Sequence, residues 1–215
     1  MYVGRIVAVG LSRQGKVVGM YRVSSRSFPN RQATVRGKAV AIVPREGFEP
    51  ESEQNPFVSY NCIRVAREYI VVGNGTHTDL IAGHLDSGMN GRDALVSSLF
   101  EFDYEQDDLA TPRIGGVIKL DSRCFYLGVV RRDALLVREV EVAPGQVRYI
   151  ATYEHNYPSK AFRDDEFVAR EAGDACIHIL EKGIFRELER PVTAACAFEE
   201  EGTVSLAVRA MDSTS

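Results

Sequence analysis

Apolar and polar residues alternate over residues 2–10 and 16–24, and this period of two predicts a pair of β-strands. The polar stretch 12–15 ends in a glycine and predicts a hairpin loop between them. Similar patterns predict strands at residues 38–44, 58–65, 68–73, 114–120, 123–130, 134–142 and 146–153, and a closing hairpin at 192–198 and 203–211.

Apolar residues at helical spacing predict helices in two blocks. The first block holds a short helix at 79–85 and a longer one from about 92 to about 105. The second block covers about 165–188, where Gly173 and Gly183 interrupt the pattern, so we expect two helices there.

The predicted order is strands, helices, strands, helices and strands, which is typical of the α+β class with largely antiparallel sheets. Each sheet and each helix has one apolar face to bury. Two packed sheets with a helical layer outside each meet this need. We interpret the acidic stretch 45–57 as a loop inserted between strands, and we expect one domain over residues 1–215.

Composition narrows the function classes. The chain is 45% hydrophobic and 26% charged, as in ordinary globular proteins, and its net charge of −4 argues against nucleic acid or an anionic membrane as partner. No apolar run reaches membrane-spanning length, and the first residues lack the pattern of a signal peptide. The four cysteines are far apart and sit among apolar neighbours, which favours reduced thiols in a cytoplasmic protein.

The segment from Tyr21 to Arg31 concentrates hydrogen-bond donors at the end of a predicted strand. It reads Tyr-Arg-Val-Ser-Ser-Arg-Ser-Phe-Pro-Asn-Arg. Guanidinium groups match phosphate oxygens two at a time, so the segment indicates an anion site. A solvated loop with arginines paired to surface carboxylates is the alternative. Strand alternation puts Arg22 and Ser24 on one face, but it does not say which arginine turns inward.

Several segments, taken in order, resemble the archaeal-type IMP cyclohydrolase family. They are Met1–Arg5, Tyr21–Arg31, Tyr60–Ile63, Asn74–Asp79, Asp103–Glu105, Thr111–Ile114, Thr152–Glu154 and Pro191–Ala195. The resemblance covers nearly the whole chain. It implies closure of the purine ring of FAICAR, a formylated aminoimidazole carboxamide ribotide, to give IMP and water. It also implies a four-layer α-β-β-α sandwich similar to that of N-terminal nucleophile hydrolases. Met1-Tyr2 offers no nucleophile for the self-cleavage of those hydrolases.

The resemblance also implies roles for residues. The catalytic candidates are Arg31, Tyr60, Glu105 and Lys182. The substrate-binding candidates are Tyr21, Arg22, Ser24, Ser25, Arg26, Ser27, Asn61, Asn74, Thr76, His77, Asp79 and Tyr104. The expected partner is a small nucleotide, and the family favours a homo-oligomer. Glu105 is the candidate proton acceptor, while Tyr60 and Lys182 supply protons or hold the oxyanion.

Cyclisation within one molecule requires no metal and no cofactor, and the scattered histidines form no metal-ligand pattern. Each candidate also has a structural interpretation. Tyr60 fits an inward strand aromatic, Tyr104 and Glu105 fit a solvated helix end, residues 74–79 fit a turn and a helix cap, and Lys182 fits a surface lysine. Two other functions remain open: a non-catalytic nucleotide-binding protein, and an amide-bond hydrolase of the same fold with a nucleophile such as Cys62.

Overall fold

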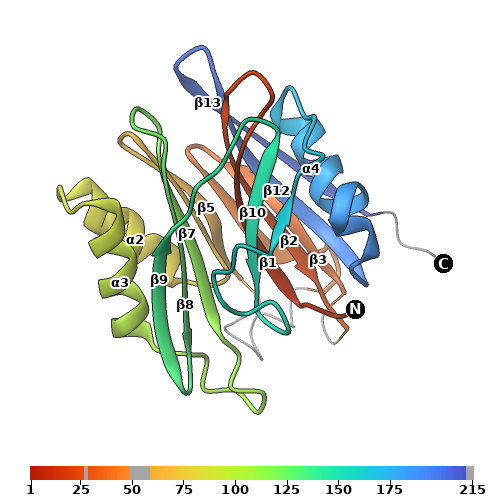
Figure 1. Cartoon of the computed structure of the whole chain (residues 1–215). Coiled ribbons are helices and arrows are strands. Elements are labelled where there is room, and N and C mark those ends of the chain that lie inside the picture. Colours follow the sequence, from red (N-terminus) through yellow and green to blue (C-terminus); the bar gives the residue numbers. More distant parts are fainter. Residues whose placement is uncertain (27–28, 49–58, 212–215) are drawn as a thin grey trace.

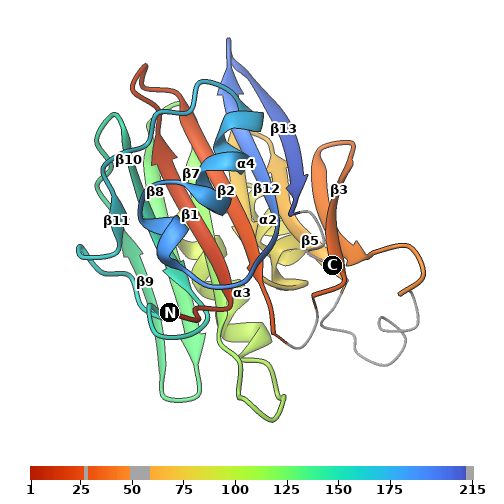
Figure 2. The same ribbon diagram turned by 90° about the vertical axis from the view of Figure 1, so that its right-hand side faces the viewer.

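The computed structural model describes residues 1–26, 29–48 and 59–211. Two antiparallel sheets lie face to face, and helices cover the outer face of each (Figure 1). The layers run from α2 (His77–Asp86) and α3 (Gly91–Phe102), through a seven-stranded and a six-stranded sheet, to α4 (Ala172–Glu181). Figure 2 shows α4 lying across the six-stranded sheet. The predicted α+β class with antiparallel sheets is confirmed.

The six-stranded sheet places the N-terminal hairpin and the C-terminal hairpin side by side. Its order is β11 (Arg163–Asp164), β10 (Gln146–Ala151), β1 (Arg5–Leu11), β2 (Val17–Ser24), β12 (Pro191–Glu200) and β13 (Thr203–Ala210). The β1–β2 and β12–β13 hairpins meet through the β2–β12 pair.

The seven-stranded sheet follows the chain without a crossover. Its order is β3 (Arg31–Arg36), β4 (Ala39–Pro44), β5 (Tyr60–Ala66), β6 (Tyr69–Gly73), β7 (Arg113–Lys119), β8 (Cys124–Arg131) and β9 (Ala134–Glu139). The helices α2 and α3 connect β6 to β7 and pack on the outer face of this sheet.

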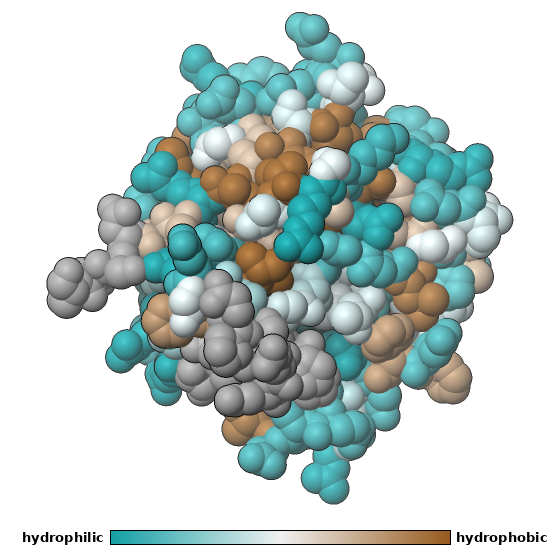
Figure 3. Space-filling view, turned by 180° about the vertical axis from the view of Figure 1, so that it is seen from behind, coloured by the Kyte–Doolittle hydropathy of each residue, from teal (hydrophilic) through white to brown (hydrophobic). Residues whose placement is uncertain are grey.

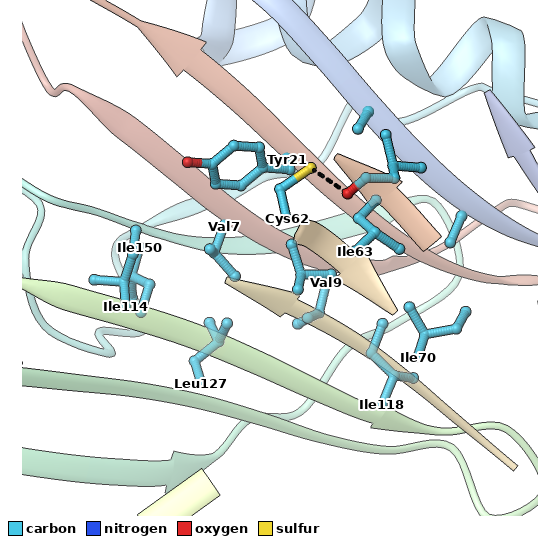
Figure 4. Packing of buried hydrophobic residues seen from close by; sticks show 14 of the residues in the cluster. Val7, Val9, Tyr21, Cys62, Ile63, Ile70, Ile114, Ile118, Leu127 and Ile150 are labelled. Atoms are coloured by element: carbon cyan, nitrogen blue, oxygen red, sulfur yellow. Dashed lines mark hydrogen bonds between the residues drawn. The ribbon is translucent and has the colours of Figure 1, made fainter. Parts of the chain in front are cut away.

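Side-chain alternation in β2 shows how the layers are filled. Tyr21 and Val23 face the other sheet and belong to the central core, whereas Val18 and Met20 face α4. Figure 4 shows the ring of Tyr21 beside Cys62 in the central core, with its hydroxyl at the end facing away from that thiol. A strand buried on both faces carries an apolar residue at nearly every position, as β2 does.

Gly19 allows the two sheets to approach each other. A Cβ at this position would lie 2.8 Å from Ile70 Cγ2 on the opposite sheet, which is closer than real carbon atoms pack. The absence of a side chain at the centre of β2 therefore sets the local spacing between the sheets.

Most predicted elements are found within a few residues of their expected positions. Two strands were not predicted: β3 and the two-residue β11. The sequence of β3, Arg-Gln-Ala-Thr-Val-Arg, is polar because only one of its edges and one of its faces are covered. The second helical block is confirmed as two helices, α4 and the 3₁₀ helix η1 (Gly183–Glu187). Residues 165–170 are not helical.

The prediction of the longer helix was wrong at its C-terminal end. Helix α3 stops at Phe102, because Asp103 adopts a φ of +56° and turns the chain. Tyr104 and Glu105 therefore lie in the following loop and not at a helix terminus. In the described residues, no helix has both the length and the apolar composition needed to cross a membrane.

Candidate active site

Two phenols meet between the sheets. Tyr21 comes from β2 and Tyr60 begins β5, so the pair joins the two sheets. Their hydroxyl oxygens are 2.7 Å apart, and their rings meet edge to face. Both side chains are buried, and burial raises the pKa of each phenol. The pair is a shielded acid at one end of the central core.

The two phenols are not equivalent. Burial raises the pKa of Tyr60, but the positive charges of Arg31 and Arg5 and the hydrogen bond to Tyr21 act in the opposite direction. The pKa of Tyr21 is raised well above its ordinary value by burial, and Tyr60 raises it further. Either hydroxyl can donate in this hydrogen bond, and Tyr60 is the phenol whose ionised form the surrounding charges favour more.

A buried carboxylate lies between two arginines. Glu105 is only 2% exposed. Arg5 Nη2 donates to its Oε2 at 3.1 Å, and Arg113 Nη1 lies 3.7 Å from its Oε1. Burial raises the pKa of Glu105, the two arginines oppose this rise, and Asp107 adds to it. A carboxylate with a raised pKa in a shielded site is suited to accept a proton near neutral pH.

The loop after α3 holds this carboxylate in place. The Glu105 N–H donates to the Thr111 carbonyl at 2.8 Å, and the Asp107 carboxylate accepts from the Thr111 N–H and hydroxyl. The Thr111 hydroxyl also lies 3.0 Å from the Tyr153 hydroxyl. These bonds close the loop on itself and tie it to the segment after β10.

An aromatic and cationic rim lies next to this loop. Tyr2 stacks on Tyr153 with centroids 5.9 Å apart, and the Arg26 guanidinium lies over the Tyr2 ring at 4.3 Å. Arg26 is exposed and pairs with Glu189 at 2.9 Å. The predicted anion-binding segment therefore reaches the surface at Arg26, beside the Tyr153 end of the site.

Of the other residues in that segment, Arg31 and Ser25 are buried. Arg31 begins β3, and its positive charge favours the ionised form of the Tyr60 phenol. Ser27 lies outside the described residues.

The geometry does not support Arg22 and Ser24 as substrate ligands. Both point away from Tyr21, towards α4, and Arg22 Nε donates to Ser24 Oγ at 2.9 Å. The other guanidinium nitrogens of Arg22 donate to main-chain carbonyls around the end of α4 and η1. These carbonyls belong to Ile179, Leu180, Phe185, Leu188 and Glu189. Arg22 is a buried cap for that layer, since a helix end leaves carbonyls without partners.

Two polar candidates pair with each other on the opposite face of β5. Asn61 Nδ2 donates to both carboxylate oxygens of Asp79 in α2, at 2.9 and 3.1 Å, and Arg64 pairs with the same carboxylate. Asn61 and Tyr60 are neighbours along a strand and therefore point to opposite faces. Thr76 is exposed at the start of α2 and makes no capping bond through its side chain. The phenol pair and this group thus occupy different layers.

Asn74 and His77 brace the start of β7. Asn74 Nδ2 donates to the Pro112 carbonyl at 3.0 Å, and its Oδ1 accepts from the Ile114 N–H at 2.7 Å. His77 Nε2 lies 3.0 Å from the Ile114 carbonyl, so this nitrogen carries the proton, and its Nδ1 is a buried acceptor without a partner in the described residues. Burial, and then the charge of Arg113, lower the pKa of His77 to about 3.

Lys182 and Tyr104 are not brought to the phenol pair. Lys182 is exposed at the end of α4, on the outer side of the six-stranded sheet. Tyr104 is half-buried in the loop next to Glu105, and its main-chain N–H bonds to Asp103. The structure therefore groups Tyr21, Tyr60 and Arg31 on one side and Glu105 on the other, with Arg5 between them.

Sequence reasoning gave no role to Arg5 and Arg113. A signal for Arg5 was present, because it falls at the inward parity of β1 together with Val7 and Val9. A charged residue at an inward strand position needs a partner, and Glu105 supplies it. In the described part of the chain, no group of histidines, cysteines or acidic residues is arranged to hold a metal ion.

Comparison with known proteins gives a consistent result. The sequence model of a family described as IMP cyclohydrolase-like protein matches residues 2–203. A protein named IMP cyclohydrolase from Methanosphaera stadtmanae is 45% identical over 94% of this chain and 96% of its own length. Proteins of the same name from Methanothrix thermoacetophila and Methanocaldococcus jannaschii are 41% and 38% identical, each over 97% of this chain. These matches cover 98% and 99% of the two relatives.

Proposed function

The chain belongs to the family of IMP cyclohydrolase-like proteins, and we propose that it closes the purine ring of FAICAR to give IMP and water at the site between Tyr60 and Glu105. It is an enzyme of purine biosynthesis, and its substrate is a small nucleotide. The observation that carries the site proposal is the Arg5 guanidinium, which bonds Glu105 and whose charge also acts on the phenols of Tyr60 and Tyr21.

The reaction joins two arms of one molecule. The carboxamide nitrogen attacks the formyl carbon and loses one proton. The formamide nitrogen loses a second proton as its double bond to that carbon forms, and the formyl oxygen takes up both protons and leaves as water. Holding the two arms in contact accounts for much of the rate enhancement, since the reacting atoms no longer have to find each other. The remaining tasks are to accept a proton from nitrogen and to deliver protons to oxygen.

The two buried groups divide these tasks. Glu105 accepts the amide proton, because its raised pKa makes it a better base than an exposed carboxylate. Tyr60 donates to the formyl oxygen, and the positive charges of Arg31 and Arg5 stabilise the negative charge that develops there. Tyr21 supports Tyr60 through their hydrogen bond.

The ribotide phosphate binds to the Tyr21–Arg31 segment. Arg31 is buried beside the phenols, and Arg26 is exposed at the adjacent rim, so the two cations can bracket an anion that enters from solvent. Serine hydroxyls of the same segment, Ser25 among them, add short donors. The Glu189 carboxylate that now pairs with Arg26 would be exchanged for the phosphate.

The proposal extends to the fold family, the oligomeric state and the cellular location of the protein. The layer order supports a likeness to the N-terminal nucleophile hydrolases, with one domain over residues 1–215. The edge strands β3, β9, β11 and β13 offer unpaired backbone groups for self-association into a homo-oligomer. The phosphorylated substrate and the four free cysteines support a cytoplasmic location.

An amide-bond hydrolase is the weaker alternative. Its candidate nucleophile, Cys62, is buried in the central core, and burial raises the pKa of this thiol well above its ordinary value (Figure 4). The thiol donates to the Val40 carbonyl at 3.4 Å, and no described histidine approaches it. A thiol so shielded is a poor nucleophile. Alkylating reagents applied to the folded protein should therefore leave turnover intact.

The direct test is to incubate the purified protein with FAICAR and to follow IMP formation without added metal or cofactor. We expect IMP to form well above the uncatalysed rate. Arg26→Ala should weaken IMP binding, measured by calorimetry, while the matched surface variant Arg92→Ala leaves it unchanged. Binding of IMP without any turnover would show instead that the chain is a non-catalytic nucleotide-binding protein.

A further inference from the structure

Arg5 occupies an inward position at the end of the central core. It begins β1, lies opposite Val23 of β2, and shares its face with Val7. Tyr21 pairs with Val7, so it is a diagonal neighbour of Arg5 on the same face. The fold therefore brings a guanidinium to the phenol pair from the same sheet that carries Tyr21.

The main chain at Arg5 is fixed from both sides. Its N–H donates to Thr152 Oγ1 at 3.1 Å, and its carbonyl accepts from the Thr152 N–H at 3.0 Å. The Thr152 hydroxyl donates in turn to the Val3 carbonyl. This reciprocal clamp leaves the side chain little freedom at its base, which is what a group that orients others requires.

The guanidinium of Arg5 makes only part of the contacts it could make. Nη2 bonds Glu105 Oε2 at 3.1 Å, whereas Nε is buried and has no hydrogen-bond partner in the part of the chain that the structure describes. A buried donor without a partner is costly and calls for an explanation, of which a catalytic role is one. The side chain retains 15% exposure, so it borders accessible space.

The acidic groups around Arg5 are ones that it stabilises in their ionised form, whereas it lowers the pKa of the neighbouring cation Arg113. Burial disfavours the cation, but Glu105, Tyr60, Tyr21 and Tyr153 outweigh burial, and the pKa of Arg5 is raised above its ordinary value. Arg5 is therefore positively charged at neutral pH. Glu105 is also influenced by Arg113 and Asp107, and Tyr60 by Arg31, Tyr21 and Cys62.

Arg113 provides an internal comparison. It lies on the other face of the seven-stranded sheet, where its guanidinium lies over the Phe102 ring at 5.2 Å and Nη1 is 3.7 Å from Glu105. It contributes to the pKa of Glu105, whereas Tyr60 belongs to the central core on the opposite side of that sheet. Arg5 therefore bonds Glu105 from the face that also carries Tyr21, whereas Arg113 approaches Glu105 from the outer face.

We propose that Arg5 is a positioning residue for ring closure, in which one guanidinium orients the Glu105 carboxylate through its hydrogen bond and places a fixed positive charge beside the Tyr21–Tyr60 pair. The inference rests on the proposed function and adds a residue to it. Loss of this cation would destabilise the ionised forms of Glu105 and Tyr60 together. The proton affinities of Glu105 and Tyr60 then rise together, and the whole range of active pH moves upward.

The test compares pH–rate profiles of the wild type, Arg5→Gln, Arg5→Lys and Arg113→Gln. Removing an opposite charge that lies within about 4–6 Å of a titratable group shifts the pKa of that group by about one unit or more. In Arg5→Gln we expect both the acidic and the basic limb of kcat to move up by about one unit, with a loss of activity at neutral pH of about tenfold. Arg113→Gln should move only the acidic limb, and Arg5→Lys, which keeps the charge, should restore both limbs.

A second measurement does not depend on turnover. Tyrosinate absorbance, with Tyr60→Phe as the blank, reports the ionisation of Tyr60 in each variant. Unchanged limbs in a folded Arg5→Gln protein, or equal shifts of both limbs in Arg113→Gln, would overturn the proposal. If Arg5→Gln does not fold, an Arg5→Lys profile that keeps both limbs supports it, and one that moves either limb rejects it. If the wild type fails to convert FAICAR, the proposed function falls, and the absorbance titration still decides the role of Arg5.

Discussion

The hydroxyl oxygens of Tyr21 and Tyr60 lie 2.7 Å apart and join two strands that belong to different sheets. Among the contacts described for them, neither residue has another phenol or carboxylate as close. The contact sits where β2 ends and β5 begins, which is also where Arg5 and Arg31 bring positive charge.

The first prediction separates the two phenols. Tyr60→Phe removes the proposed proton donor and should lower kcat by about 10²–10⁴, the usual contribution of a positioned acid or base. Tyr21→Phe removes only the hydrogen bond that holds down the pKa of Tyr60, so the basic limb of the pH–rate profile should move to higher pH with a smaller loss of kcat. Steady-state kinetics across pH provide the measurement. An equal loss of kcat in the two variants would contradict this division of roles.

The second prediction concerns Glu105. Burial raises its pKa, so the base is protonated, and activity lost, as the pH falls through a value above that of an exposed glutamate. Glu105→Gln should lower kcat by about 10²–10⁴ and abolish the acidic limb, while the affinity for IMP changes little. Glu101→Gln, an exposed glutamate on α3, is the matched control and should retain the profile of the wild type. An acidic limb that persists in Glu105→Gln would assign the base to another residue.

The third prediction treats Arg22 as a structural residue. Arg22→Met leaves several buried carbonyls at the end of α4 and in η1 without a donor, and we expect a loss of about 3–5 kcal/mol in the free energy of unfolding. Urea denaturation measures this loss, and Arg92→Met, on the surface, should change stability by about 0.5 kcal/mol or less. IMP affinity of the folded fraction should be unchanged. If the Arg22→Met protein is stable but no longer binds IMP, Arg22 is a phosphate ligand and not a structural residue.

The contrast between Arg22 and Arg31 shows what the sequence could and could not predict. Strand alternation correctly grouped Arg22 with Ser24, but alternation does not say which face meets the other sheet and which meets a helix. Both faces of β2 are buried, so the usual apolar-in, polar-out signal is absent. Only the position of α4, more than 140 residues away in sequence, decides that Arg22 is a helix cap.

The layers were easier to predict than the site. Hairpin turns and helical spacing are local signals, and they predicted nearly every strand and helix. The site depends on distant partners instead: the Arg5–Glu105 bond spans 100 residues, and the Tyr21–Tyr60 bond spans 39. The strand β3 was not predicted because its polar sequence reflects an edge position, which local pattern does not distinguish from a loop.

The fourth prediction is a loss of stability in mild acid that originates at His77. Its imidazole is fully buried, donates from Nε2 to the Ile114 carbonyl, and has a pKa lowered to about 3 by burial and by Arg113. In the unfolded chain the same group takes up a proton near pH 6.5. Between these two values the unfolded state binds one more proton than the folded state, so stability falls as the pH falls.

The size of this effect follows from the two pKa values. Each pH unit below about 6.5 should cost about 1.4 kcal/mol of unfolding free energy, which amounts to roughly 4–5 kcal/mol by pH 3. His77→Gln keeps a donor for the Ile114 carbonyl and cannot be protonated. The unfolding free energy of this variant, measured by urea denaturation, should therefore fall less steeply with falling pH, by about 1.4 kcal/mol per pH unit. His155→Gln is the matched control, because His155 is partly exposed and its own lowered pKa should have a smaller effect. Parallel stability curves for the wild type and His77→Gln between pH 6.5 and 4 would show that the buried imidazole does not set the acid sensitivity of the fold.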